Sequence, residues 1–169
     1  MTTLAADKPR AREHGAINSL PVIAADIIYE GAMVGDNGSG YARPLVAGDP
    51  FRGVARRKVD NSAGAAGDKR VEVETDVYVE LPITSLAITD VGKDVFASDD
   101  DTFTLTQSTN TRIGYVHRWV STGIGIIRCV ANRGLVTELT AITGGEAPTE
   151  AEHNLVVTAV NALIRRLGY

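Results

Sequence analysis

Residues 70–81 alternate between apolar and polar side chains almost without exception. Aliphatic residues and one threonine fall on odd positions, and charged residues or a tyrosine fall on even positions. Successive side chains of a β-strand point to opposite faces, so this alternation predicts one strand with a buried face and a solvated face. Half-buried strands of this kind are typical of antiparallel sheets. The predicted inward residues are Val71, Val73, Thr75, Val77, Val79 and Leu81, and the predicted outward residues are Arg70, Glu72, Glu74, Asp76, Tyr78 and Glu80.

Short runs of the same character occupy most of the chain between residues 21 and 133. They are rich in Val, Ile and Thr, and clusters of Gly, Asp, Asn and Ser separate them, as at residues 36–40 and 98–102. Such clusters favour turns, because Gly and Asn tolerate positive φ. The other predicted strands are residues 22–24, 27–34, 41–46, 51–56, 95–97, 103–106, 112–120 and 125–131. The pattern predicts an all-β domain over residues 21–133, a compact antiparallel β-barrel or sandwich.

Residues 1–20 have the composition of an extended N-terminal arm. This segment carries Asp7, Lys8, Pro9, Arg10, Arg12 and Glu13, and apolar periodicity is almost absent. Such a segment cannot bury enough surface to fold alone. It either orders against a partner or frays, and the sequence leaves both possibilities open.

The C-terminal end of the chain changes to a helical period. A Gly-rich linker over residues 134–148 leads to a predicted helix over residues 149–169, which Thr149 and Glu152 begin with a capping box. Apolar residues then recur at intervals of four, three and four, which is the spacing of a coiled-coil seam. They are Val156, Val160, Leu163 and Leu167. A helix of this length is not secure alone, so it packs either on its own β domain or between chains.

Charge and cysteine content restrict the partners and the compartment. The net charge of −4 gives no general attraction to nucleic acid. Cys129 is the only cysteine, so an internal disulfide is excluded and synthesis in a reducing cytoplasm is expected. Its apolar neighbours predict a small buried hydrophobe. The N-terminus lacks the apolar region of a signal peptide and no apolar run is long enough for a membrane span, so we expect neither secretion nor membrane insertion.

Motifs of catalytic and metal sites are fragmentary. Gly92 and Lys93 resemble the end of a phosphate-binding loop, but Ala87 replaces its leading glycine and Asp94 replaces its Ser or Thr. Residues 99–101 are three aspartates without the alternate spacing of an EF-hand loop, so we expect a solvated turn. His14, His117 and His153 have no ligand-like spacing.

The acidic face of residues 72–80 supplies the carboxylates that a glycosidase needs. This face is more simply the wet side of a strand, and a small hydrolase remains an alternative. We predict that the protein is no enzyme, and that it has no catalytic, cofactor-binding or metal-ligating residues.

One basic cluster occurs in this acidic chain. Residues 52–70 carry six Lys or Arg side chains against two Asp, a local charge of +4, with Arg56, Arg57 and Lys58 at its centre. Such a charge asymmetry can orient a protein on an acidic partner surface. A solvated loop base explains it equally well.

Three segments resemble the capsid cement, or head decoration, proteins of tailed bacteriophages. They are YARPLVAGDPFRGVARRKVDNSAGAAGDKRVEV (residues 41–73), DVGKDVFASDDDTFTLT (residues 90–106) and LAADKPRAREHG (residues 4–15), so the resemblance extends roughly over residues 4–130. The resemblance implies a small β-rich protein on the outer surface of the virion, made in the bacterial host's cytoplasm. Its expected partners are the major capsid protein and itself, as a homotrimer at threefold or quasi-threefold positions, without specific nucleic acid or membrane.

On this resemblance we expect the arm and the basic cluster to bind the capsid. The expected contact residues are Lys8, Arg10, Arg12, Arg56, Arg57 and Lys58. A head fibre or host-surface adhesin module is the alternative within the same class of structural proteins.

Overall fold

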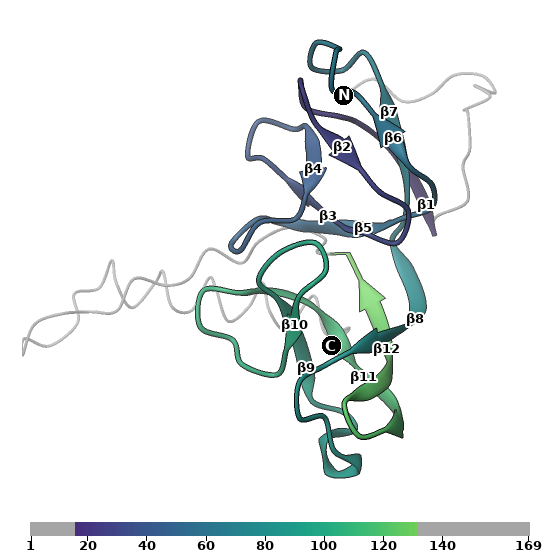
Figure 1. The fold of residues 1–169 in the computed structure, drawn as a ribbon, viewed down its shortest axis with the longest axis vertical. Coiled ribbons are helices and arrows are strands. Elements are labelled where there is room, and N and C mark those ends of the chain that lie inside the picture. Colours follow the sequence, from purple (N-terminus) through teal and green to yellow (C-terminus); the bar gives the residue numbers. More distant parts are fainter. Residues whose placement is uncertain (1–15, 132–169) are drawn as a thin grey trace, which may run out of the picture. The chain divides into compact units, whose positions relative to one another are not determined.

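The computed structural model of the protein describes residues 16–131 (Figure 1). Over these residues the chain forms twelve β-strands and one short 3₁₀-helix, η1 (Ile88–Asp90), and the prediction of an all-β, antiparallel fold is confirmed for them. Residues 1–15 of the predicted arm, the whole predicted linker and the predicted C-terminal helix lie outside this range, as do Lys8, Arg10, Arg12, Val156, Val160, Leu163 and Leu167. Within residues 16–131, no helix is long and apolar enough to cross a membrane.

The first sheet contains strands from residues 17–74. Its order is β1 (Ile17–Pro21), β7 (Arg70–Glu74), β5 (Phe51–Ala55), β3 (Met33–Asp36) and β4 (Ala42–Pro44), with antiparallel neighbours throughout. β2 (Ile27–Ile28) and β6 (Val59–Asp60) form a separate two-stranded sheet. A parallel bridge joins Val22, just after β1, to Ala42 in β4. The two edges of the first sheet therefore meet, along a line that we name seam 1.

The second sheet contains strands from residues 76–130 and is also antiparallel. Its order is β10 (Phe103–Thr104), β9 (Asp94–Ala97), β11 (Thr111–Ser121), β12 (Ile124–Val130) and β8 (Asp76–Pro82). A parallel bridge joins Ile83, just after β8, to Phe103 in β10. The edges of this sheet also meet, along seam 2. Figure 1 shows the two sheets as two groups of strands, with β8 leading from one to the other.

The alternating segment 70–81 is not one strand, as we predicted, but two strands in different sheets. The expected faces are correct, since Val71, Val73 and Leu81 are buried and the even positions are more exposed. The break falls at Thr75. Its N–H donates to Ala16 beside β1, and its carbonyl accepts from Ala131 after β12. One residue thus hydrogen-bonds toward both sheets, which the period of two cannot reveal.

The predicted arm is too long at its C-terminal end. Residues 17–20 belong to β1 and pair with β7, as in Leu20 opposite Val71 and Asn18 opposite Val73. The prediction failed because β1 is an edge strand that gains its hydrogen bonds from residues far along the chain, so its own composition shows little. Residues 22–24 were expected as a strand and contribute only the bridge from Val22 to Ala42.

Two apolar cores lie within the described residues. One fills the first sheet and contains Val34, Ala55 and Val73 among others. The other joins the interior of the second sheet to Met33 and Phe51 of the first sheet. β3 is buried at all four residues, and its neighbouring residues Met33 and Val34 belong to different cores.

The two sheets have the same topology. If β1, β3, β4, β5 and β7 are matched in order with β8, β9, β10, β11 and β12, the strand order of the first sheet becomes that of the second. The match is residue by residue: the pairs Val34–Gly53 and Asp36–Ala42 correspond to Val95–Gly114 and Ala97–Phe103, each 61 positions later. The bridges at the two seams are also 61 positions apart. We name residues 17–74 module 1 and residues 76–130 module 2.

Hydrogen bonds outside the ladders repeat with the same offset. The N–H of Gly31 donates to the carbonyl of Ala55 at 2.9 Å, and 61 positions later Gly92 donates to Val116 at 2.8 Å. Both glycines have positive φ, 82° and 88°. The described chain is therefore an internal repeat. The repeat is not evident in the sequence, because few matched positions carry the same residue, among them Leu20 and Leu81, Pro21 and Pro82, and Gly53 and Gly114.

Candidate interaction surfaces and pocket

The central basic residues lie at the end of β5 and in the turn that follows. A terminal nitrogen of Arg56 and one of Arg57 contact the same carboxylate oxygen of Glu72 at 3.2 and 2.8 Å, and Arg56 Nε lies 4.0 Å from Glu74. The local charge of +4 over residues 52–70 is thus partly offset by the two carboxylates of β7, Glu72 and Glu74. The count along the sequence missed this, because β5 and β7 are neighbours only in the sheet.

Exposed groups nevertheless remain beside these ion pairs. The side chain of Arg57 is 67% exposed, and the ammonium group of Lys58 lies 5.1 Å from the ring centre of Tyr29, which is itself 57% exposed. A cation over an aromatic ring is attracted by the ring's quadrupole. Tyrosine and arginine are enriched at the energetic centres of protein interfaces. Tyr29, Arg57 and Lys58 therefore form a surface suited to a protein partner, which we name the basic patch.

The joint between the modules involves two of the three segments that carry the family resemblance. Val46, before β5, forms an antiparallel bridge with Asp99, in the turn after β9. In the same region the N–H of Met33 donates to the carbonyl of Asp100 at 2.9 Å. The predicted solvated turn is wrong for two of its three aspartates, since Asp99 and Asp100 are half-buried and only Asp101 is exposed. Burial raises the pKa of Asp100. The residues 16–131 hold no cluster of metal-ligating groups.

A hydroxyl group completes this joint. Thr111, at the start of β11, accepts a hydrogen bond from the N–H of Gly48 at 2.9 Å and donates to the carbonyl of Asp49 at 3.0 Å. The carboxylate of Asp49 is held by Arg43 through two hydrogen bonds of 2.8 Å. The loop of module 1 is therefore tied to module 2 by directional bonds as well as by the shared core.

Three of the four acidic residues of the hydrolase alternative, Glu72, Glu74 and Asp76, are engaged in ion pairs. Glu72 and Glu74 pair with the arginines that follow β5, and Asp76 accepts two hydrogen bonds from Arg128 at 2.8 and 2.7 Å. Arg128 also lies 5.9 Å from the ring centre of Tyr78. These residues form the outer surface of β7 and β8, where paired charges contribute little more than solubility and orientation.

An aromatic contact on the outer face of the second sheet was not predicted from the sequence. The rings of Tyr78 and His117 meet edge to face, with centres 4.7 Å apart, and Tyr78 is 53% exposed. The residues lie on β8 and β11, with β12 between them, so only the sheet order brings them together. The predicted small buried hydrophobe Cys129 is confirmed, and burial raises the pKa of its thiol to about 12. Lys93 of the fragmentary phosphate-loop motif pairs with Asp90 at 2.8 Å.

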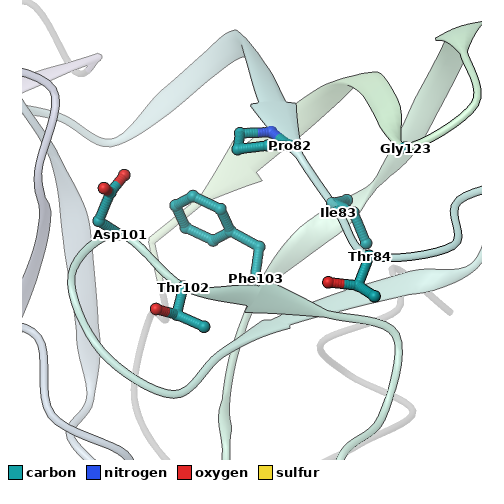
Figure 2. Close-up of a pocket in the computed structure, with 7 residues that line it drawn as sticks. All are labelled: Pro82, Ile83, Thr84, Asp101, Thr102, Phe103 and Gly123. Atoms are coloured by element: carbon teal, nitrogen blue, oxygen red, sulfur yellow. The ribbon is translucent and has the colours of Figure 1, made fainter.

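A pocket of about 330 Å³ opens at seam 2. Figure 2 shows the ring of Phe103 between Asp101 on one side and Ile83 and Thr84 on the other. The pocket thus has an apolar floor, a carboxylate at one rim and a hydroxyl at the other. The remaining lining residues are Pro82, Thr102 and Gly123. Glu72 and Glu74 do not line this pocket, so it does not serve the hydrolase alternative.

Comparison of the chain with protein-family models gave no match, and comparison with curated proteins gave none either.

Proposed function

We propose that the protein is a structural decoration, or cement, protein that binds the outside of an assembled phage head as a trimer at threefold or quasi-threefold positions. In this role it has no catalytic activity and stabilises the shell by cross-linking capsid subunits. The major capsid protein is its partner, and the virion surface is its location.

The observation that carries this proposal is the meeting of the resembling segments at the joint between the modules. Residues 41–73 and 90–106 are distant in sequence, yet Val46 of the first bridges to Asp99 of the second. A resemblance made only of unrelated turn patterns would be scattered over the surface. Here the two segments contact each other through this bridge, which supports a likeness of fold as well as of sequence.

The pairing of β1, which follows the arm, supports the attachment role. β1 pairs with β7 over five residues, from Ile17 opposite Glu74 to Pro21 opposite Arg70. Ala16 is held by the N–H of Thr75 at 2.8 Å, at the point where β7 passes to β8. Tension on the arm would therefore be transmitted to the centre of the described fold.

The proposed mechanism is multivalent attachment without chemistry. Each copy of a trimer offers one arm with Arg10 and Arg12 and one basic patch. Once one contact is made, the others form at a high effective concentration, so weak individual contacts suffice. Acidic groups on the capsid subunits would be the counterpart of the arm and of Arg57 and Lys58.

The proposal is tested by adding the purified protein to expanded heads that lack it and imaging them by cryo-electron microscopy. We expect ordered protrusions at local threefold positions and greater resistance of the heads to heat. Removal of residues 1–15 leaves β1 intact and is expected to keep the β signal in circular dichroism while occupancy falls. Heads without protrusions, or full occupancy by the shortened chain, would contradict the proposal or the role of the arm, respectively.

The trimer is tested separately with Val160→Asp combined with Leu163→Asp. If the predicted helix associates between chains, these charges in an apolar contact shift sedimentation from trimer towards monomer. If the helix packs on its own β domain, the melting temperature falls and the oligomeric state stays the same. A variant that keeps both the oligomeric state and the melting temperature of the wild type would refute the two roles considered for the helix.

A further inference from the structure

In module 1, a loop of the same module covers seam 1. In the loop of residues 61–69, the N–H of Gly67 donates to the carbonyl of Val22 at 2.9 Å. The side-chain amide of Asn61 donates to the carbonyl of Ile23 at 2.8 Å. Tyr41 also borders the loop, because a Cβ on Gly67 would lie 3.6 Å from its ring. The loop thus packs over the seam with small residues and satisfies its carbonyl groups.

Module 2 keeps the seam but lacks the loop. Val22 N–H donates to Lys69, and its counterpart Ile83 donates to Gly123 at 2.8 Å, so Gly123 takes the place of Lys69. The offset between the modules is 61 at Val22 and 54 at Lys69, so the second connection is seven residues shorter. Within residues 16–131, nothing in module 2 corresponds to Gly67 or to Asn61. The pocket at seam 2 occupies this position.

The comparison of the two modules therefore indicates what kind of segment could bind in the pocket. Thr84 is the counterpart of Ile23, and its carbonyl accepts no hydrogen bond from residues 16–131. Asp101, whose carboxylate receives no ion pair from these residues, replaces Gly40 at the rim. A matching occupant is a segment of small residues with a hydrogen-bond donor for Thr84 and a cation for Asp101.

One segment of this chain outside the described residues has this composition. The covering loop of module 1 contains Ala65-Ala66-Gly67-Asp68-Lys69, and the arm contains Ala5-Ala6-Asp7-Lys8. The arm segment supplies small side chains, backbone N–H groups and a lysine immediately before Pro9. We propose that residues 5–8 of a second copy occupy the pocket at seam 2, with Lys8 beside Asp101.

The length of the arm favours a second copy over the same chain. Ala16 is held beside Thr75, and the pocket begins at Pro82, about 24 Å away at 3.4 Å per strand residue. Residues 9–16 span at most about 26–29 Å when fully extended. If residues 5–8 bound the pocket of their own chain, residues 9–16 would have to be almost fully extended along β8. The arm of a neighbouring copy is not subject to this limit on its length.

This inference goes beyond the proposed function, because it concerns a contact between copies and requires no capsid. It assigns Lys8 to that contact and leaves Arg10 and Arg12 for the shell. The arms would thus link decoration proteins to one another as well as to the head.

The experiment mixes two full-length chains that each carry one new cysteine, Ala6→Cys in one and Thr84→Cys in the other, under mild oxidation. Only contact between copies can join these chains by a disulfide. We expect a covalent heterodimer, and its loss when an excess of a synthetic peptide of residues 1–12 is added. The same peptide with both alanines replaced by leucine should leave the heterodimer in place, because the larger side chains do not fit. The native Cys129 is buried and does not interfere.

The matched control is Ser62→Cys, which places the second cysteine in the covering loop of module 1. Ser62→Cys is expected to give no heterodimer with Ala6→Cys. Equal linking of Ser62→Cys and Thr84→Cys, or no linking at all, would overturn the inference. A chain that carries both Ala6→Cys and Thr84→Cys and links only within itself would show that the arm fills its own pocket, which also overturns the contact between copies. Neither outcome depends on binding to heads.

Discussion

Replacement of Thr111 by valine tests whether hydrogen bonds at the joint hold the two modules together. Valine has nearly the same shape as threonine but cannot hydrogen-bond. Thr111 is 6% exposed, so the change leaves a buried site filled and removes two bonds, of 2.9 Å from Gly48 and 3.0 Å to Asp49. The variant therefore isolates hydrogen bonding from packing.

The size of the effect follows from the burial of the two partners. Asp49 is buried, so its carbonyl loses its partner without access to water, which costs about 1–3 kcal/mol. Gly48 is exposed, and water can replace the bond to its N–H at little cost. We expect a loss of about 2 kcal/mol in the free energy of unfolding, which corresponds to a fall of about 4–8 °C in melting temperature for a chain of this size.

The assay is urea unfolding followed by circular dichroism, together with hydrogen exchange at the amide of Gly48. Thr111→Ser is the control, because it keeps the hydroxyl and loses one methyl group, at a cost of about 1 kcal/mol. We expect exchange at Gly48 to accelerate in Thr111→Val and to remain slow in Thr111→Ser. A Thr111→Val protein as stable as the wild type, with unchanged exchange at Gly48, would refute the role of these bonds.

Four other substitutions test the matched strands, the acid-sensitive turn and the covering loop. A Cβ in Gly53→Ala or Gly114→Ala would overlap a backbone carbonyl of the neighbouring strand. We expect each to cost about 3 kcal/mol in urea unfolding, against about 1–2 kcal/mol for Gly38→Ala, where a Cβ meets no atom within 4 Å; similar losses for all three would contradict the packing argument. Although burial alone would raise the pKa of Asp36, hydrogen bonds from a paired arginine and two backbone amides hold it below 3.8. The stabilisation that the Asp36 carboxylate provides is therefore present above that pH and is lost as the pH falls through the lowered pKa. Asp36→Asn should therefore have a lower melting temperature than the wild type at neutral pH, and the two melting temperatures should converge in acid. A difference in melting temperature that does not change with pH would contradict this linkage. Asn61 is 1% exposed and donates two hydrogen bonds, of 2.8 and 2.9 Å, to carbonyl groups. Asn61→Asp should destabilise by about 2–4 kcal/mol, as measured by urea unfolding, and an unchanged midpoint would exclude its role in anchoring the loop.

The positions of the turns and of most strands could be predicted from the sequence. The runs 51–56, 95–97 and 125–131 match β5, β9 and β12 within a residue or two. This succeeds because the alternation of side chains and the preference of Gly and Asn for positive φ are local properties. The exposed or buried face of each position in residues 70–81 was correct for the same reason.

The candidate surfaces were less accessible to prediction. Arg56 and Arg57 were identified as a basic cluster, but the carboxylate of Glu72 that pairs with both of them comes from a neighbouring strand. The contact of Tyr78 with His117 likewise depends on the sheet order. Pairings of this kind are decided between strands, and a one-dimensional charge count contains no information on them.

The sequence by itself determined that residues 16–131 form short antiparallel strands joined by tight turns, because these follow from side-chain period and local backbone preference. Only the tertiary structure decided that Thr75 divides one alternating run between two sheets, since its backbone bonds to Ala16 and Ala131 at distant points of the chain. The tertiary structure also revealed the repeat, because matched positions such as Ala42 and Phe103 share a place in the hydrogen-bond ladder while their side chains differ. Backbone pairing is common to both modules, whereas the side chains adapt to different neighbours, so one seam is covered by its own loop and the other is open.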